Sequence, residues 1–99
     1  MATRANLKPI ALAPASTPAP FTLADAEAMH MLAVGTAEPD QQKRALKWII
    51  EQAAATYQWA YRDNQRETDV ALGRAFVGQQ IVGLTKIDLA TLRRQANAT

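Results

Sequence analysis

The sequence contains no cysteine, a single histidine and few aromatic residues, which make up 6% of the chain. The absence of cysteine excludes disulfides, thiolate metal sites and cysteine nucleophiles, and one histidine is too few for a histidine-based metal cage or proton relay. The formal charge of +2 is too small to indicate nucleic acid as a partner by itself. No stretch approaches the roughly 20 apolar residues of a membrane-spanning helix. We therefore expect no metal, no cofactor and no membrane partner.

Motifs that would indicate an enzyme are also missing. The sequence has no Gly-rich phosphate loop, serine elbow or calcium loop. Three pairs of carboxylates lie near the starts of predicted helices, where the helix dipole explains them: Asp25 and Glu27, Glu38 and Asp40, and Glu67 and Asp69. The expected function is therefore non-enzymatic.

Alanine and proline dominate what is present. Hydrophobic residues make up 48% of the 99-residue chain, but alanine supplies much of that fraction, so we expect one small domain with a thin core. Four of the five prolines lie within residues 1–20, where they favour extended backbone that buries little surface. We predict an extended Pro/Ala-rich arm over residues 1–21 and a single helical domain over residues 22–99.

Capping signals and breakers predict two helices in the first half of that domain. Thr22 followed by Asp25 is a short-acid capping box, and the helix that it opens runs to Gly35. Pro39 suits the first turn of a second helix, and nothing interrupts this helix until about Tyr61. At roughly 22 residues it is the longest predicted element, about 33 Å in length.

The second half predicts a turn and two more helices. Residues 62–67, RDNQRE, carry no apolar side chain and are typical of a turn. Thr68 is the expected cap of a third helix that ends near Ile87, and Asp88 that of a short fourth helix reaching Arg94. No alternating pattern predicts a strand. The expected fold is all-α: a small bundle of three main helices and a short C-terminal helix, preceded by the arm.

The long predicted helix is apolar on two sides. A helical wheel places one broad stripe toward the core: Leu46, Ile49, Ile50, Ala53, Tyr57, Ala60 and Tyr61. The opposite side carries Arg44, Trp48, Gln52, Ala55, Trp59 and Arg62. Either the helix is buried on both faces, or the second face binds a partner, with guanidinium groups lying across the two indoles.

The third predicted helix contains three glycines, Gly73, Gly78 and Gly83. Each costs roughly 1 kcal/mol relative to alanine in a helix interior. Close approach of another backbone is the usual compensation. The sequence therefore predicts a protein-interaction surface formed by Arg44, Trp48, Gln52, Trp59, Arg62, Gly73, Arg74 and Gly78.

Cations form a second candidate surface. Lys43, Lys47, Arg93 and Arg94 are the expected nucleic-acid contacts, with a tryptophan available to stack on bases. Solvated helix faces and the dipole at a helix C-terminus also explain these charges. Nucleic acid is therefore an alternative partner and not the favoured one.

The segment 69–87, DVALGRAFVGQQIVGLTKI, resembles the closing helix of a family of small helical proteins encoded among the head and structural genes of short-tailed bacteriophages. Five positions carry the likeness: Gly73, Arg74, Val77, Gly78 and Ile81. An amphipathic helix, a polar turn and the Gly-Arg pair follow in the same order over roughly residues 43–87. The resemblance implies a small virion or head-assembly protein and assigns no catalytic residue.

Three hypotheses follow. The first is a bacteriophage structural or assembly protein that docks on a larger head, portal or tail protein, with homo-oligomers expected. It would be located in the virion, and in the host cytoplasm before assembly. The second is a small helical nucleic-acid-binding protein, a packaging subunit or regulator, whose last two helices form a helix-turn-helix. The third is a phage inhibitor of a host factor.

Overall fold

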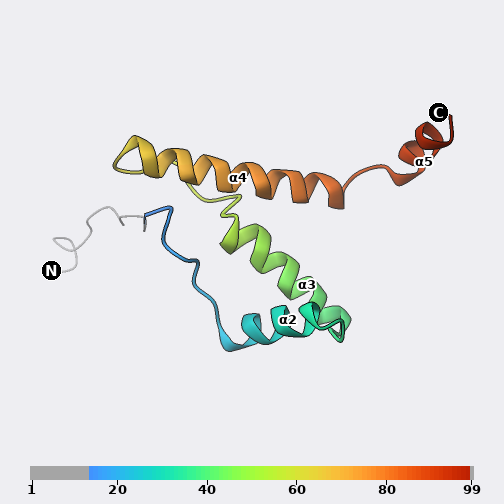
Figure 1. The fold of residues 1–99 in the computed structure, drawn as a ribbon, viewed down its shortest axis with the longest axis horizontal. Helices are drawn as coiled ribbons and strands as arrows, with labels where there is room; N and C mark the ends of the chain where they lie inside the picture. Colours follow the sequence, from blue (N-terminus) through green and yellow to red (C-terminus); the bar gives the residue numbers. More distant parts are fainter. Residues whose placement is uncertain (1–13, 99) are drawn as a thin grey trace, which may run out of the picture.

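Four α-helices and one π-helical turn make up the regular structure of residues 14–98, which are the residues that the computed structural model describes. With the labels of Figure 1, they are α2 (Leu23–Ala33), α3 (Pro39–Trp48), the π-helical turn η1 (Ile49–Ala53), α4 (Gln65–Thr85) and α5 (Leu89–Ala98). No strand occurs between residues 14 and 98. The predicted all-α class is confirmed, while residues 1–13 of the predicted arm lie outside the described range.

Helix α2 begins where the capping box predicts. The Thr22 hydroxyl accepts a hydrogen bond from the Asp25 amide at 3.2 Å, and the Asp25 carboxylate accepts one from the Thr22 amide at 2.9 Å. The chain leaves the helix at Gly35, whose φ of 80° is the left-handed conformation that favours glycine.

The second predicted helix starts correctly and ends early. Pro39 is its first residue, but α3 passes into the π-helical turn and stops at Ala53 rather than near Tyr61. Ala55 takes a left-handed φ of 50°, and the Thr56 amide donates to the Ile50 carbonyl at 3.1 Å. This six-to-one hydrogen bond closes the helix without the glycine that usually marks such an end, so the sequence contains no breaker there. Residues 54–64 are a loop.

The third predicted helix starts earlier than expected. The Asn64 side chain caps α4 by accepting from the Glu67 amide at 2.8 Å. Thr68 is not the cap, because it lies inside α4, where its hydroxyl accepts from the Arg62 amide at 2.9 Å. The predicted polar turn is therefore divided between a loop and the first turn of the helix.

Helix α5 follows Asp88 as predicted and extends past Arg94 to Ala98. The Asp88 carboxylate accepts from the amides of Ala90 and Thr91 at 3.1 and 3.3 Å. This is the arrangement of an N-terminal cap.

The helices pack in pairs along the chain. Helix α2 packs on α3, and η1 packs on α4, whereas α5 packs on no other helix of residues 14–98. In Figure 1, α5 lies beyond the C-terminal end of α4, far from α2 and α3. The radius of gyration is 18.2 Å and the long axis is 65 Å, compared with about 13 Å for the radius of a compact domain of this length. The described part of the chain is thus elongated.

The core is small, as the composition predicts. Among residues 14–98, the hydrophobic residues that are buried are all alanines: Ala15, Ala28, Ala45, Ala54, Ala55, Ala71 and Ala75. The expected core stripe of the second helix is wrong, because Leu46, Tyr57 and Tyr61 are exposed and Ile49 and Ile50 are half-buried. The early end of that helix is the cause, since Tyr57 and Tyr61 fall in the loop that follows it.

Candidate protein-interaction surface

Arg74 joins three separate segments of the protein. From the third turn of α4, its half-buried guanidinium donates to the carbonyls of Gln52 and Ala53 at 3.0 and 2.9 Å, and to the carbonyl of Ala15 at 2.5 Å. The carbonyls at a helix C-terminus lack partners within the helix and carry partial negative charge. Arg74 therefore caps the end of η1 and holds the N-terminal segment at the same time.

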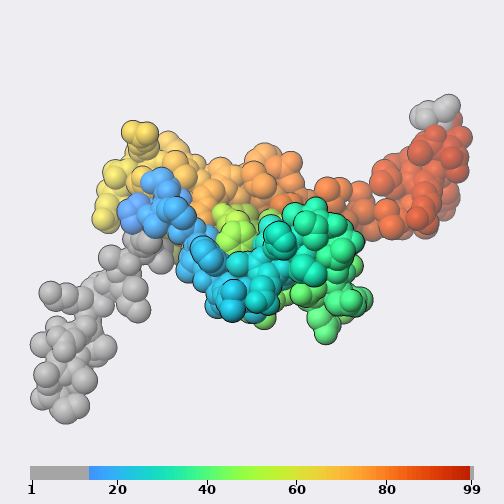
Figure 2. Space-filling view, turned by 60° about the horizontal axis from the view of Figure 1, so that its bottom comes forward, coloured from blue at the N-terminus to red at the C-terminus, as the bar shows by residue number. Residues whose placement is uncertain are grey.

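Glu67 holds that N-terminal segment from a second side. Its carboxylate accepts from the Ser16 amide at 3.0 Å and from the Ser16 hydroxyl at 2.9 Å. The hydrogen bond from the Ser16 amide is the main reason that the pKa of Glu67 lies below its ordinary value. Figure 2 shows residues 14–21 lying across the beginning of α4. The sequence predicted an arm that buries little, but Ala15 is only 2% exposed, so the described part of the arm is docked.

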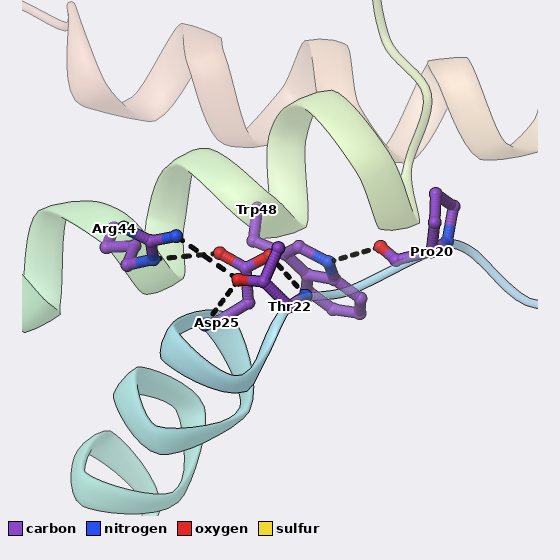
Figure 3. A network of polar contacts seen from close by, with 5 residues as sticks. All are labelled: Pro20, Thr22, Asp25, Arg44 and Trp48. Atoms are coloured by element: carbon purple, nitrogen blue, oxygen red, sulfur yellow. Dashed lines mark hydrogen bonds and ion pairs between the residues drawn. The ribbon is translucent and has the colours of Figure 1, made fainter.

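Arg44 and Trp48 also bind the N-terminal part of the chain (Figure 3). The Arg44 guanidinium pairs with the Asp25 carboxylate at 2.9 Å, and the Trp48 indole donates to the Pro20 carbonyl at 3.0 Å. The Thr22 amide is the main cause of a lowered pKa at Asp25, and Arg44 adds to it. Arg44 is thus occupied by an ion pair, and Trp48 is half-buried.

Trp59 lies on a different surface from Trp48, because the helix that was expected to align them ends at Ala53. Trp59 is 68% exposed, and Tyr57 and Tyr61 are each 69% exposed. The rings of Trp59 and Tyr61 lie 5.5 Å apart, tilted by 50°, which is the geometry of a packed aromatic pair. We call Tyr57, Trp59 and Tyr61 the aromatic loop.

Of the three glycines in α4, only Gly78 has a close neighbour within the described residues. A β-carbon there would overlap the Thr56 side chain and lie 3.0 Å from that of Ala54, whereas one at Gly73 or Gly83 would meet nothing within 4 Å. The predicted close approach is therefore found at Gly78, which is buried under the loop after η1.

The predicted interaction residues thus separate into two groups. Trp59 and Gly73 are exposed. The others make contacts inside the protein: Arg44, Trp48, Gln52, Arg62, Arg74 and Gly78. Glu67, Ser16 and Asp25 were missed as contact residues, because their partners are set by tertiary packing and no sequence spacing indicates them.

The candidate nucleic-acid contacts do not form one patch. Lys43 and Lys47 lie on α3, and Arg93 and Arg94 lie on α5, which packs on no other described helix. Helices α4 and α5 do not pack on each other as the helices of a helix-turn-helix do.

Residues 14–98 contain neither a cluster of metal-ligating side chains nor a helix that could span a membrane. No group of three His, Cys, Asp or Glu side chains gathers there as a metal site would require. None of the helices in this range combines the length and the apolar character needed to cross a membrane.

Comparison with known proteins finds no match to the chain among family models, curated proteins or solved structures. The likeness of residues 43–87 to small phage proteins therefore stays a prediction.

Proposed function

We propose that this chain is a non-enzymatic bacteriophage structural or assembly protein that docks on a larger virion component. The resemblance of its third predicted helix to small phage head proteins suggests the setting. The exposed apolar side chains support a docking role: among the described residues, fifteen large apolar side chains are exposed, and exposed apolar surface that gathers in patches marks interaction sites.

The aromatic loop is the observation that carries this proposal. Three large aromatic side chains within five residues of one loop are about two-thirds exposed. Tryptophan and tyrosine are enriched among the residues that dominate binding energy at protein interfaces. In water, these side chains add nothing to the stability of the fold, whose buried hydrophobic residues among those described are alanines. The loop is also anchored, since Gly78 packs under Thr56 at its beginning and Thr68 binds the Arg62 amide near its end.

The test is a binding measurement with two matched variants. Purified phage particles are analysed by mass spectrometry for the chain, and its affinity for the isolated head, portal and tail proteins is then measured. Trp59→Ala is expected to weaken binding by about 2 kcal/mol or more, roughly 30-fold. Leu23→Ala, at a comparably exposed apolar residue on α2, should leave the affinity within about threefold. Absence of the chain from particles, together with no binding to any virion protein, would refute the proposal.

Related measurements test the two alternative functions, a nucleic-acid-binding protein and a phage inhibitor of a host factor. Helix α5 exposes Arg93 and Arg94 away from the other described helices, which leaves both side chains accessible to a phosphate group. Duplex DNA binding that weakens steeply with salt would support a nucleic-acid-binding protein, and no binding at about 50 mM salt would dismiss it. A protein that binds a host factor and is missing from particles would be a phage inhibitor.

A further inference from the structure

Helix α4 uses one face inside the protein and leaves the opposite face open. The face toward η1 carries the buried residues Thr68, Ala71, Ala75 and Gly78. At 100° per residue, the opposite face is centred on Gly73, Val77, Gln80 and Leu84, whose spacings of four, three and four residues are those of a coiled-coil seam. Val77 is 51% exposed and Leu84 is 70% exposed. This set is the outer seam of α4.

Gly73 has no structural role within the described residues. It lies in the helix interior with an ordinary negative φ, and a β-carbon there would meet no atom within 4 Å. Neither a turn nor internal packing therefore requires a glycine at this position, although it weakens the helix relative to alanine. A glycine on the surface of a helix does allow a side chain or backbone of another helix to approach closely.

The outer seam also lacks charge over most of its length. From Ala75 to Thr85 the helix contains no charged residue. The charged residue next to Gly73 is Arg74, whose guanidinium is bound to three carbonyls inside the protein. A second copy of the same helix would therefore meet this surface without repulsion between like charges.

We propose that α4 pairs with α4 of a second copy in an antiparallel arrangement, about a two-fold axis midway between Val77 and Gln80. This proposal goes beyond docking on a virion protein, because it concerns the chain with itself. A two-fold interface uses the same patch on both copies. The patch must therefore contain both a side chain that projects and a recess that receives the same side chain of the other copy. The outer seam has both, since Leu84 projects at one end and Gly73 leaves a recess at the other.

The spacing of the seam fits that axis. In an antiparallel pair centred between Val77 and Gln80, the Leu84 side chain of each copy faces Gly73 of the other. Val77 of each copy then faces Gln80 of the other. The antiparallel direction also places the positive end of one helix dipole beside the negative end of the other. This match between Leu84 and Gly73 is a self-complementary one, which favours a second copy of the chain over a partner of different sequence.

The association is expected to be weak. The 21 residues of α4 span about 32 Å, and a single helix pair lies at or below the low end of the areas buried by stable interfaces. Dissociation constants in the micromolar to millimolar range are expected. Light scattering of the pure chain, at concentrations raised from about 1 μM to about 1 mM, should show the mean mass rising from 10.8 kDa toward twice that value.

Cysteine cross-linking tests the register directly, because the native chain has no cysteine. A mass-tagged Val77→Cys variant is mixed in equal amounts with Gln80→Cys and mildly oxidised. Random collision would give one half heterodimer, whereas the proposed register gives a clear excess of heterodimer, since only facing β-carbons approach to disulfide distance. Leu72→Cys, exposed on the same helix but outside the seam, is the matched control and should stay monomeric.

A second variant separates the interface from the fold. Gly73→Leu fills the recess, and within the described residues its new β-carbon meets no atom within 4 Å outside the adjacent turns of α4. It should keep or raise the melting temperature and weaken dimerisation at least tenfold. The proposal is overturned by a monomer at every concentration, by a random or homodimeric cross-linking pattern, or by a Gly73→Leu variant that dimerises like the native chain. None of these results depends on a virion partner.

Discussion

Replacing Arg74 with methionine is expected to destabilise the protein more than the replacement of any other described cation. Methionine keeps most of the aliphatic stem of the side chain and removes the guanidinium. The three carbonyls that the guanidinium binds belong to Gln52, Ala53 and Ala15. The substitution therefore uncaps the C-terminus of η1 and releases the docked N-terminal segment in one step.

The expected magnitude follows from these contacts. A hydrogen bond to a charged group contributes about 1.5 to 3 kcal/mol. Because one half-buried side chain makes all three bonds, and water replaces part of the loss, we expect about 2 to 4 kcal/mol in total. For a chain of 99 residues, this corresponds to a fall in melting temperature of roughly 10 to 25 °C. It is a large part of the total stability of such a small fold.

Urea unfolding followed by tryptophan fluorescence measures this effect, and two further variants define its cause. Arg66→Met removes an exposed cation from the same helix and should change the stability by less than about 0.5 kcal/mol. Arg74→Lys keeps the charge but loses the planar fork, so it should lose about half as much as Arg74→Met. If Arg74→Met unfolds like Arg66→Met, or if lysine restores the full stability, then the guanidinium does not join the three segments.

Three more outcomes are expected. The folded-state pKa of Glu67 is lowered chiefly by the Ser16 amide. The contact therefore stabilises the fold above the ordinary pKa of 4.5, and this stabilisation is lost as the pH falls through the folded-state value. The urea midpoints of the native chain and of Glu67→Gln should differ at pH 7 and converge near pH 3. Gly78→Ala should cost about 1 to 3 kcal/mol because the loop after η1 covers that position, whereas Gly73→Ala should gain about 0.5 to 1 kcal/mol in thermal melts, and equal effects would contradict the packing. Asn64→Ala should cost about 1 kcal/mol by chemical denaturation, and no loss would mean that another residue caps α4.

The helix starts show why some predictions succeeded. The capping box at Thr22, the proline at position 39 and the cap at Asp88 each act within one helical turn. The capping hydrogen bonds join residues two or three positions apart, so the sequence contains both partners. The start of α4 was missed because Asn64 and Thr68 are both residues that favour helix caps. In the structure Asn64 is the cap, and the Thr68 hydroxyl instead accepts from the Arg62 amide in the preceding loop.

The interaction surface was predicted less well, for a related reason. Its expected residues were placed on one helical wheel, and a wheel is valid only while the helix continues. Once the helix ends at Ala53, Trp48 contacts Pro20 and Trp59 joins an exposed loop. Gly73 and Gly78 were equivalent in the sequence, and only the position of the loop after η1 distinguishes them.

Local sequence alone was therefore sufficient for the all-α class, the caps at Thr22 and Asp88 and the small size of the core, because these depend on composition and on neighbours within about four residues. Tertiary structure decided where the longest predicted helix stops. No glycine or proline marks that end; Arg74, which lies 21 residues beyond Ala53, binds the carbonyls that the ending leaves without partners. The Thr56 amide closes this helix end locally, but the carbonyls of Gln52 and Ala53 gain the Arg74 guanidinium only after two distant segments have met. No local signal in the sequence indicates that contact.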